Sequence, residues 1–92
     1  MADSILQKEK RCYFCGAVNG LHLHHIYGGA NRPISDRNGF VVYLCVRHHT
    51  GEQTGVHGDE ALKNRLKKIC QREFEKTHSR EEFMRLIGKN FL

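Results

Sequence analysis

Residues 40–49 read Phe-Val-Val-Tyr-Leu-Cys-Val-Arg-His-His, an apolar run followed by one cysteine and two histidines. Its first five residues are β-branched, aromatic or aliphatic, which predicts a short strand over Phe40–Leu44. Cys45 and His48 follow with two residues between them, a spacing typical of metal ligands. The strand is therefore expected to end in one half of a tetrahedral metal site.

The other half of this site lies upstream, in Cys12-Tyr13-Phe14-Cys15-Gly16. Two thiols at the same spacing can bind one ion when the chain turns, and a Gly after the second Cys allows that turn. A structural Zn²⁺ bound by three cysteines and one histidine is the prediction, with buried thiols as the alternative. The expected ligands are Cys12, Cys15, Cys45 and His48. His49 is adjacent to His48 and could replace it. Cys70 has no partner at ligand spacing and is expected to be a core or boundary thiol.

The remaining chain predicts a small α+β domain. Leu21–His24 alternates with period two and is expected to pair with Phe40–Leu44 as a hairpin-like ribbon, with Tyr27–Asn38 as the loop between them. His48-His49 opens a short helix. Apolar residues at three-to-four spacing predict a helix over Asp59–His78, and a capping box at residues 79–82 starts a last helix, Arg80–Ile87.

Composition limits what such a domain can be. The chain has 92 residues, 39% of them hydrophobic, and no Trp, so its core is thin and a metal would help to stabilise it. The first residues are polar and no apolar run could span a bilayer, so we expect a cytoplasmic protein without a membrane partner. The formal net charge of +5 favours a phosphate-bearing partner, although simple solubility would also explain it.

The chain holds more histidines than a structural zinc site needs. His24 and His25 are adjacent on a predicted strand, so their side chains point to opposite faces: one can bind a metal while the other faces a substrate. His24, His49 and His57 together would make a three-nitrogen site with open positions, as a catalytic metal requires. His22 shares a strand face with His24, but it and His78 are expected to be uninvolved.

The order Cys-x-x-Cys, His-His-Ile, Cys-x-x-His-His resembles that of HNH endonucleases, also called ββα-metal or His-Me finger nucleases. The segments Leu23–Ala30, Leu44–His49 and Gly55–His57 are similar to small phage HNH proteins, including the recombination-enhancement (Ref) type. The resemblance covers residues 12 to about 58 of a single domain spanning 1–92. It implies a zinc-stabilised ββα-metal core, to which residues 59–92 add two C-terminal helices.

The resemblance also implies roles. His25 matches the general base that activates water, and His24, His49 and His57 match the ligands of a catalytic divalent metal. The family's central Asn braces the loop that orients the base; Asn38 is the candidate here and Asn31 the rival. The implied reaction is metal-dependent hydrolysis of DNA phosphodiester bonds.

Further expectations concern the metal and the partners. Imidazole ligands are softer than the oxygen ligands that Mg²⁺ prefers, so Zn²⁺, Ni²⁺ or Mn²⁺ should bind more readily than Mg²⁺. Arg32 and Arg37 either contact DNA phosphates or lie in a plain exposed loop. So small a domain has a limited DNA footprint, and a recombination or packaging protein is a further expected partner. The competing hypothesis is a non-catalytic zinc module that binds nucleic acid or a protein.

Overall fold

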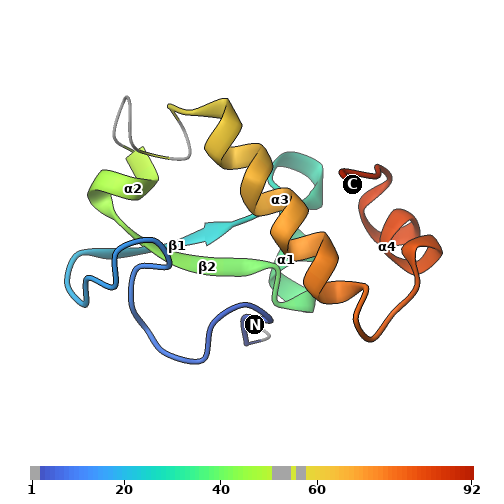
Figure 1. Ribbon diagram of the computed structural model, residues 1–92, viewed down its shortest axis with the longest axis horizontal. Coiled ribbons are helices and arrows are strands. Elements are labelled where there is room, and N and C mark those ends of the chain that lie inside the picture. The colour runs from blue at the N-terminus through green and yellow to red at the C-terminus, as the bar shows by residue number, and fades with distance from the viewer. Residues whose placement is uncertain (1–2, 51–54, 56–57) are drawn as a thin grey trace.

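A computed structural model describes residues 3–50, 55 and 58–92. Its sheet consists of two antiparallel strands, β1 (Leu21–His25) and β2 (Val41–Cys45), which lie side by side in Figure 1. The register pairs Leu21 with Cys45 and His25 with Val41. The predicted ribbon is therefore confirmed, with each strand shifted by no more than one residue at its ends.

The segment between the strands is helical, so the prediction of a loop over Tyr27–Asn38 was wrong. It contains a short 3-10 turn, η1 (Gly29–Asn31), followed by α1 (Arg32–Asn38). Pro33 sits in the first turn, where its fixed φ suits a helix and its missing N–H costs nothing. Gly39 ends the helix in the left-handed conformation, with a φ of 74°. Without a clear apolar period, these terminal signals were the only trace of the helix in the sequence.

In the described part of the chain, three helices follow β2: α2 (Val46–Thr50), α3 (Glu60–Phe74) and α4 (Arg80–Ile87). Asp59 caps α3 by accepting a hydrogen bond from the Leu62 N–H, and Ser79 and Glu82 form the predicted capping box of α4. The predicted long helix ends at Phe74 rather than His78. The chain turns there so that His78 stacks on Phe74, with 4.2 Å between the ring centroids.

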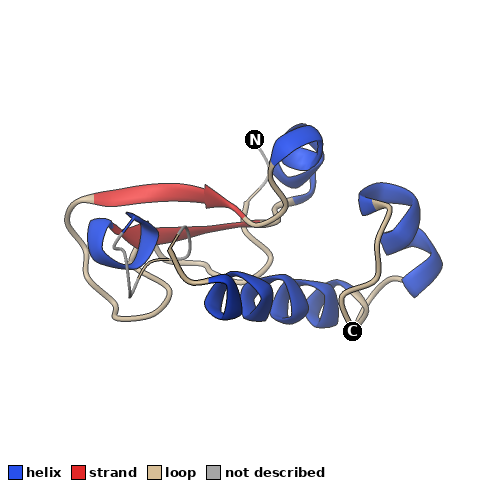
Figure 2. Cartoon of the chain, turned by 90° about the horizontal axis from the view of Figure 1, so that it is seen from above, coloured by secondary structure: helices blue, strands red, loops and turns tan. Residues whose placement is uncertain are grey.

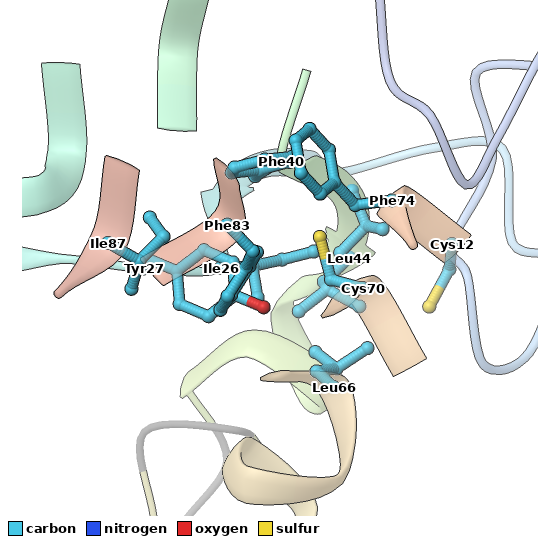
Figure 3. Packing of buried hydrophobic residues seen from close by; sticks show 11 residues of the cluster. Cys12, Ile26, Tyr27, Phe40, Leu44, Leu66, Cys70, Phe74, Phe83 and Ile87 are labelled. Atoms are coloured by element: carbon cyan, nitrogen blue, oxygen red, sulfur yellow. The ribbon is translucent and has the colours of Figure 1, made fainter. Parts of the chain in front are cut away.

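The core forms where α3 and α4 pack against the ribbon. Figure 2 shows α3 on one side of the two strands and extending past their end, with α4 beyond its C-terminal end. Tyr27 is central: its ring contacts those of Phe40, Phe83 and Phe91, and its hydroxyl donates to the Lys67 carbonyl at 2.6 Å. Figure 3 shows this cluster of buried side chains, which also includes Cys12, Ile26, Leu44, Leu66, Cys70, Phe74 and Ile87.

The C-terminal helices are thus part of the same core as the ribbon. Gln71 of α3 is fully buried, and its side chain bonds to Glu75, Asn90 and the Phe91 backbone, which fastens the C-terminal segment. Cys70 is also fully buried, as expected of a core thiol, and burial raises its pKa to about 12. Within the described residues, no helix is both long and apolar enough to cross a bilayer.

Candidate metal centre

The predicted cysteine and histidine ligands come together at one end of the ribbon. Cys12 and Cys15 lie in a turn before β1, and Gly16 completes that turn with a φ of 78° and a hydrogen bond to the Cys12 carbonyl. Cys45 is the last residue of β2, and His48 lies in α2, which begins immediately after it. The site is therefore formed by a turn, the end of a strand and a short helix, and the ligand spacing in the sequence predicted all four ligands.

The distances between the ligand atoms suit a single tetrahedral ion. One ligand atom from each of the four residues lies within 4.8 Å of all the others. Cys15 Sγ is 3.7 Å from Cys45 Sγ, and two sulfurs bound to one zinc at about 2.3 Å are about 3.7–3.8 Å apart. His48 Nδ1 is 3.6 Å from Cys12 Sγ and 3.2 Å from Cys45 Sγ. The cluster can hold a metal ion such as zinc, and His48 rather than His49 faces the thiols.

The electrostatic surroundings favour a thiolate at Cys12. Its side chain is buried, which by itself would raise the pKa, but hydrogen bonds with the backbone at Cys45, Cys15 and Phe14 lower the pKa to about 6. At Cys15, a backbone hydrogen bond at Ala17 lowers the pKa, but burial and the neighbouring thiols outweigh it and the net shift is upward. A bound metal ion would keep both Cys12 and Cys15 deprotonated, because each cysteine binds it as a thiolate.

A second group of side chains gathers along β1 and α2. His24 is almost fully buried, with an exposed fraction of 5%, and its ring centroid lies 5.4 Å from that of His49. His22 also contacts His49: the two Nδ1 atoms are 3.0 Å apart. Two of the three predicted catalytic-metal ligands, His24 and His49, are therefore adjacent, and His22 joins them although the sequence had suggested otherwise. The third, His57, lies outside the described residues.

His25 faces the opposite side of the strand. Its Nε2 lies 3.1 Å from Asp36 Oδ1 of α1, and the side chains of these two residues are 13% and 42% exposed. Asp36 was missed in the sequence because it sits in the segment expected to be a loop. Pro33 and Gly39 mark the start and the end of a helix in the sequence. This pair could have placed the Asp36 carboxylate on a helix that follows β1.

The predicted bracing residue, Asn38, has other contacts. Its side-chain amide donates to the Ile34 carbonyl at 2.8 Å, one turn earlier in α1. Asn31, the rival candidate, donates to the Ile87 carbonyl at 3.1 Å and so ties η1 to α4. In the structure, Asp36 is the side chain that hydrogen-bonds to His25. Arg32 and Arg37 are both exposed on α1, the helix that carries Asp36.

The described part of the chain has a groove elsewhere, and none of the predicted site residues that the structure describes lines it. It has a volume of about 500 Å³ and lies between the N-terminal segment and β2, where Gln7 accepts a hydrogen bond from the Tyr43 N–H. Its lining mixes acidic and basic side chains, including Asp3, Glu9, Lys8 and Lys10.

Comparison with known proteins adds no relative from which a role could be transferred. No family model, no curated protein and no solved structure matches this chain. The structure itself shows a small α+β fold with a cluster of three cysteines and one histidine that can hold a metal ion.

Proposed function

We propose that this protein is a metal-dependent DNA endonuclease of the HNH type, stabilised by zinc at Cys12, Cys15, Cys45 and His48. The observation that carries the proposal is the pair His24-His25 on β1. His24 lies against His49 of α2, whereas His25 hydrogen-bonds to Asp36 of α1. Adjacent residues of one strand thus have the surroundings suited to a metal ligand and to a general base.

The contact with Asp36 fixes how His25 would act. A carboxylate only accepts hydrogen bonds, so the His25 Nε2 donates to it and the lone pair of the neutral ring is on Nδ1. Nδ1 is then the atom that takes a proton from the attacking water. Asp36 is a positioning residue, because it holds the ring and its tautomer without touching the substrate.

The other side chains of the site bind and orient the substrate. A divalent metal held by His24 and His49 would supply Lewis-acid stabilisation of the charge on the scissile phosphate and on the leaving oxygen. Arg32 and Arg37 are exposed on the same helix as Asp36 and can contact phosphates on either side of the scissile bond. The net charge of +5 agrees with a polyanionic substrate.

The test is cleavage of supercoiled plasmid by the zinc-loaded protein, with Mg²⁺, Mn²⁺ or Ni²⁺ added in turn. The wild type should cut, and His25→Ala should lose about 10²–10⁴-fold in rate, because general-base help is typically worth that much. His78→Ala is the control, since it removes an exposed histidine from the turn before α4. It should cut like the wild type.

Two results would contradict the proposal. Equal cleavage rates for the wild type and His25→Ala would show that His25 is not the general base. Failure of the wild type to cut with any of the three metals, together with retardation of DNA in a gel, would favour a non-catalytic zinc module that binds nucleic acid. In every case the zinc content of each variant is measured, so that loss of the fold is not mistaken for loss of the chemistry.

A further inference from the structure

Lysine side chains from α3 and from the C-terminal segment gather around the ring of Phe91. We infer that Lys63, Lys67 and Lys89 form a phosphate-binding surface for the backbone of duplex DNA, made of residues that the proposed chemistry does not use. The choice of DNA as the partner rests on the proposed function, but the test measures binding without cleavage.

Buried side chains fix the position of Phe91. The C-terminal segment lies beside α3 (Figure 1), and the Phe91 N–H donates to the buried side chain of Gln71 at 2.8 Å. The centroid of the Phe91 ring lies 5.5 Å from that of Tyr27, whose hydroxyl donates to the Lys67 carbonyl. The position of Phe91 relative to Lys67 is therefore set by contacts with the core.

The Phe91 ring brings two ammonium groups together. Its centroid lies 5.3 Å from Lys67 Nζ and 5.2 Å from Lys89 Nζ. At such distances the negative face of an aromatic ring attracts a cation, so one ring holds two like charges near each other. Lys63 precedes Lys67 by one turn of α3 and lies on the same face of the helix. Three positive side chains from two segments are thus gathered on one part of the surface.

The positive charge of this cluster is not neutralised by ion pairs. Among the described residues no carboxylate forms an ion pair with any of its three lysines, whereas Lys76, just after α3, pairs with Glu73 at 2.8 Å. Burial lowers the pKa of Lys67, the Lys63 charge lowers it further, Glu60 opposes the shift, and Lys89 adds to it. A bound phosphate would relieve the repulsion between these charges, because each ammonium group can donate hydrogen bonds to its oxygens.

The same surface continues toward the helix that carries Asp36. The Asn31 side chain donates to the Ile87 carbonyl at 3.1 Å, which ties η1 to the end of α4, two residues before Lys89. Arg32 follows Asn31 directly and is exposed at the start of α1. Positive charge spread over several elements suits a polymer of phosphates better than a single small anion. The lysines would therefore lengthen the contact with DNA beyond the residues proposed for cleavage.

The experiment measures binding of a fluorescently labelled DNA duplex by the zinc-loaded full chain, followed by anisotropy at several salt concentrations with no further metal added. The affinity of the wild type should fall as the salt concentration rises. Lys67→Gln and Lys89→Gln should each bind about five- to tenfold more weakly at about 0.1 M salt. Each should also lower the slope of log affinity against log salt by about 1, because one phosphate contact is lost.

Two further variants separate the local contact from net charge. Lys76→Gln also removes one positive charge, but from a side chain that is paired with Glu73, and it should bind DNA like the wild type. Lys67→Arg keeps the charge and should keep the salt slope of the wild type. Thermal unfolding of every variant is followed, so that loss of the fold is not mistaken for loss of a contact.

Unchanged affinity and salt slope in both Lys67→Gln and Lys89→Gln would overturn the inference. An equal loss in Lys76→Gln would also overturn it, because net charge alone would then account for the effect. Binding of vesicles of phosphatidylserine and phosphatidylcholine, without binding of the duplex, would overturn it in favour of a membrane surface.

The lysine surface and the nuclease activity can fail separately. If DNA binding depends on Lys67 and Lys89 but no metal supports cleavage, the surface is real and the nuclease proposal is wrong. If both glutamine variants bind DNA like the wild type while the wild type cuts plasmid, the nuclease proposal stands and these lysines do not contact DNA.

Discussion

At the scale of single residues, spacing along the chain predicted the cysteine cluster but not the partner of His25. Cys12, Cys15, Cys45 and His48 were identified because each ligand pair has two residues between its members, and such a pair depends only on a local backbone turn. The contact of His25 with Asp36 depends on where α1 lies relative to β1, and that is a tertiary property. The pattern of residues could have placed Asp36 on a helix, but it could not have paired Asp36 with His25.

The role proposed for Asp36 leads to a prediction. In Asp36→Asn the side-chain amide can donate to His25 Nε2, which favours the tautomer with its proton on Nδ1 and removes the lone pair that the base needs. We expect the cleavage rate to fall by about 10²-fold or more, since an incorrect tautomer alone can cost as much as 10⁴-fold. Single-turnover kinetics on plasmid, with DNA affinity measured in parallel, would check it.

Controls separate orientation of the base from general effects on the protein. Asp36→Glu keeps the accepting carboxylate and should recover part of the rate. Glu81→Gln removes an exposed carboxylate from α4 and should leave the rate unchanged. A loss of DNA affinity in Asp36→Asn, with the rate of the bound complex unaltered, would mean that Asp36 does not act through His25.

At the scale of elements, the segments with a clear period or a clear cap were predicted and the one without them was not. Both strands, the start of α3 and all of α4 carry such signals. In contrast, α1 is only seven residues long, and of these only Ser35 is buried. A helix with so small a buried face has no apolar period, so only Pro33 at its start and Gly39 after its end mark it.

At this scale, the prediction concerns the stability of a variant at Gly39. Its φ is 74°, and a Cβ at this position would collide with the backbone carbonyl of Asp3 and touch Ile5 Cγ2. We expect Gly39→Ala to lower the free energy of unfolding by more than about 1–2 kcal/mol, the usual cost of the left-handed conformation, because the steric clash adds to it. Urea unfolding followed by circular dichroism would measure the loss.

Gly28 is the matched control for this substitution. It precedes η1, its φ is −93°, and a Cβ there would meet no atom within 4 Å. Gly28→Ala should therefore change stability by no more than about 1 kcal/mol, and in the stabilising direction if at all. Equal losses in the two variants would show that neither the conformation of Gly39 nor its contact with the N-terminal segment matters to stability.

At the scale of the whole molecule, one core connects the cysteine cluster to the C-terminal helices. Cys12 is 2% exposed and belongs to the same apolar cluster as Leu66, Phe74 and Phe83. A ribbon of two strands is marginal by itself, and helices of five and seven residues add little. A metal at the cluster would join the turn, the end of β2 and α2.

Removal of the metal should therefore unfold the domain. Structural zinc in small domains contributes about 10–16 kcal/mol of apparent binding free energy, which is as large as the roughly 5–15 kcal/mol of stability that a folded domain possesses. We expect a strong chelator to abolish cooperative thermal unfolding, as followed by circular dichroism, and Cys45→Ser to behave like the chelated wild type. His49→Ala is the decisive comparison, because it alters only the histidine site and should unfold cooperatively with one zinc still bound. An unchanged thermal transition after chelation would mean that the apolar core is sufficient for the fold. A loss of cooperative unfolding in His49→Ala would mean that the histidines and the cysteine cluster do not act separately.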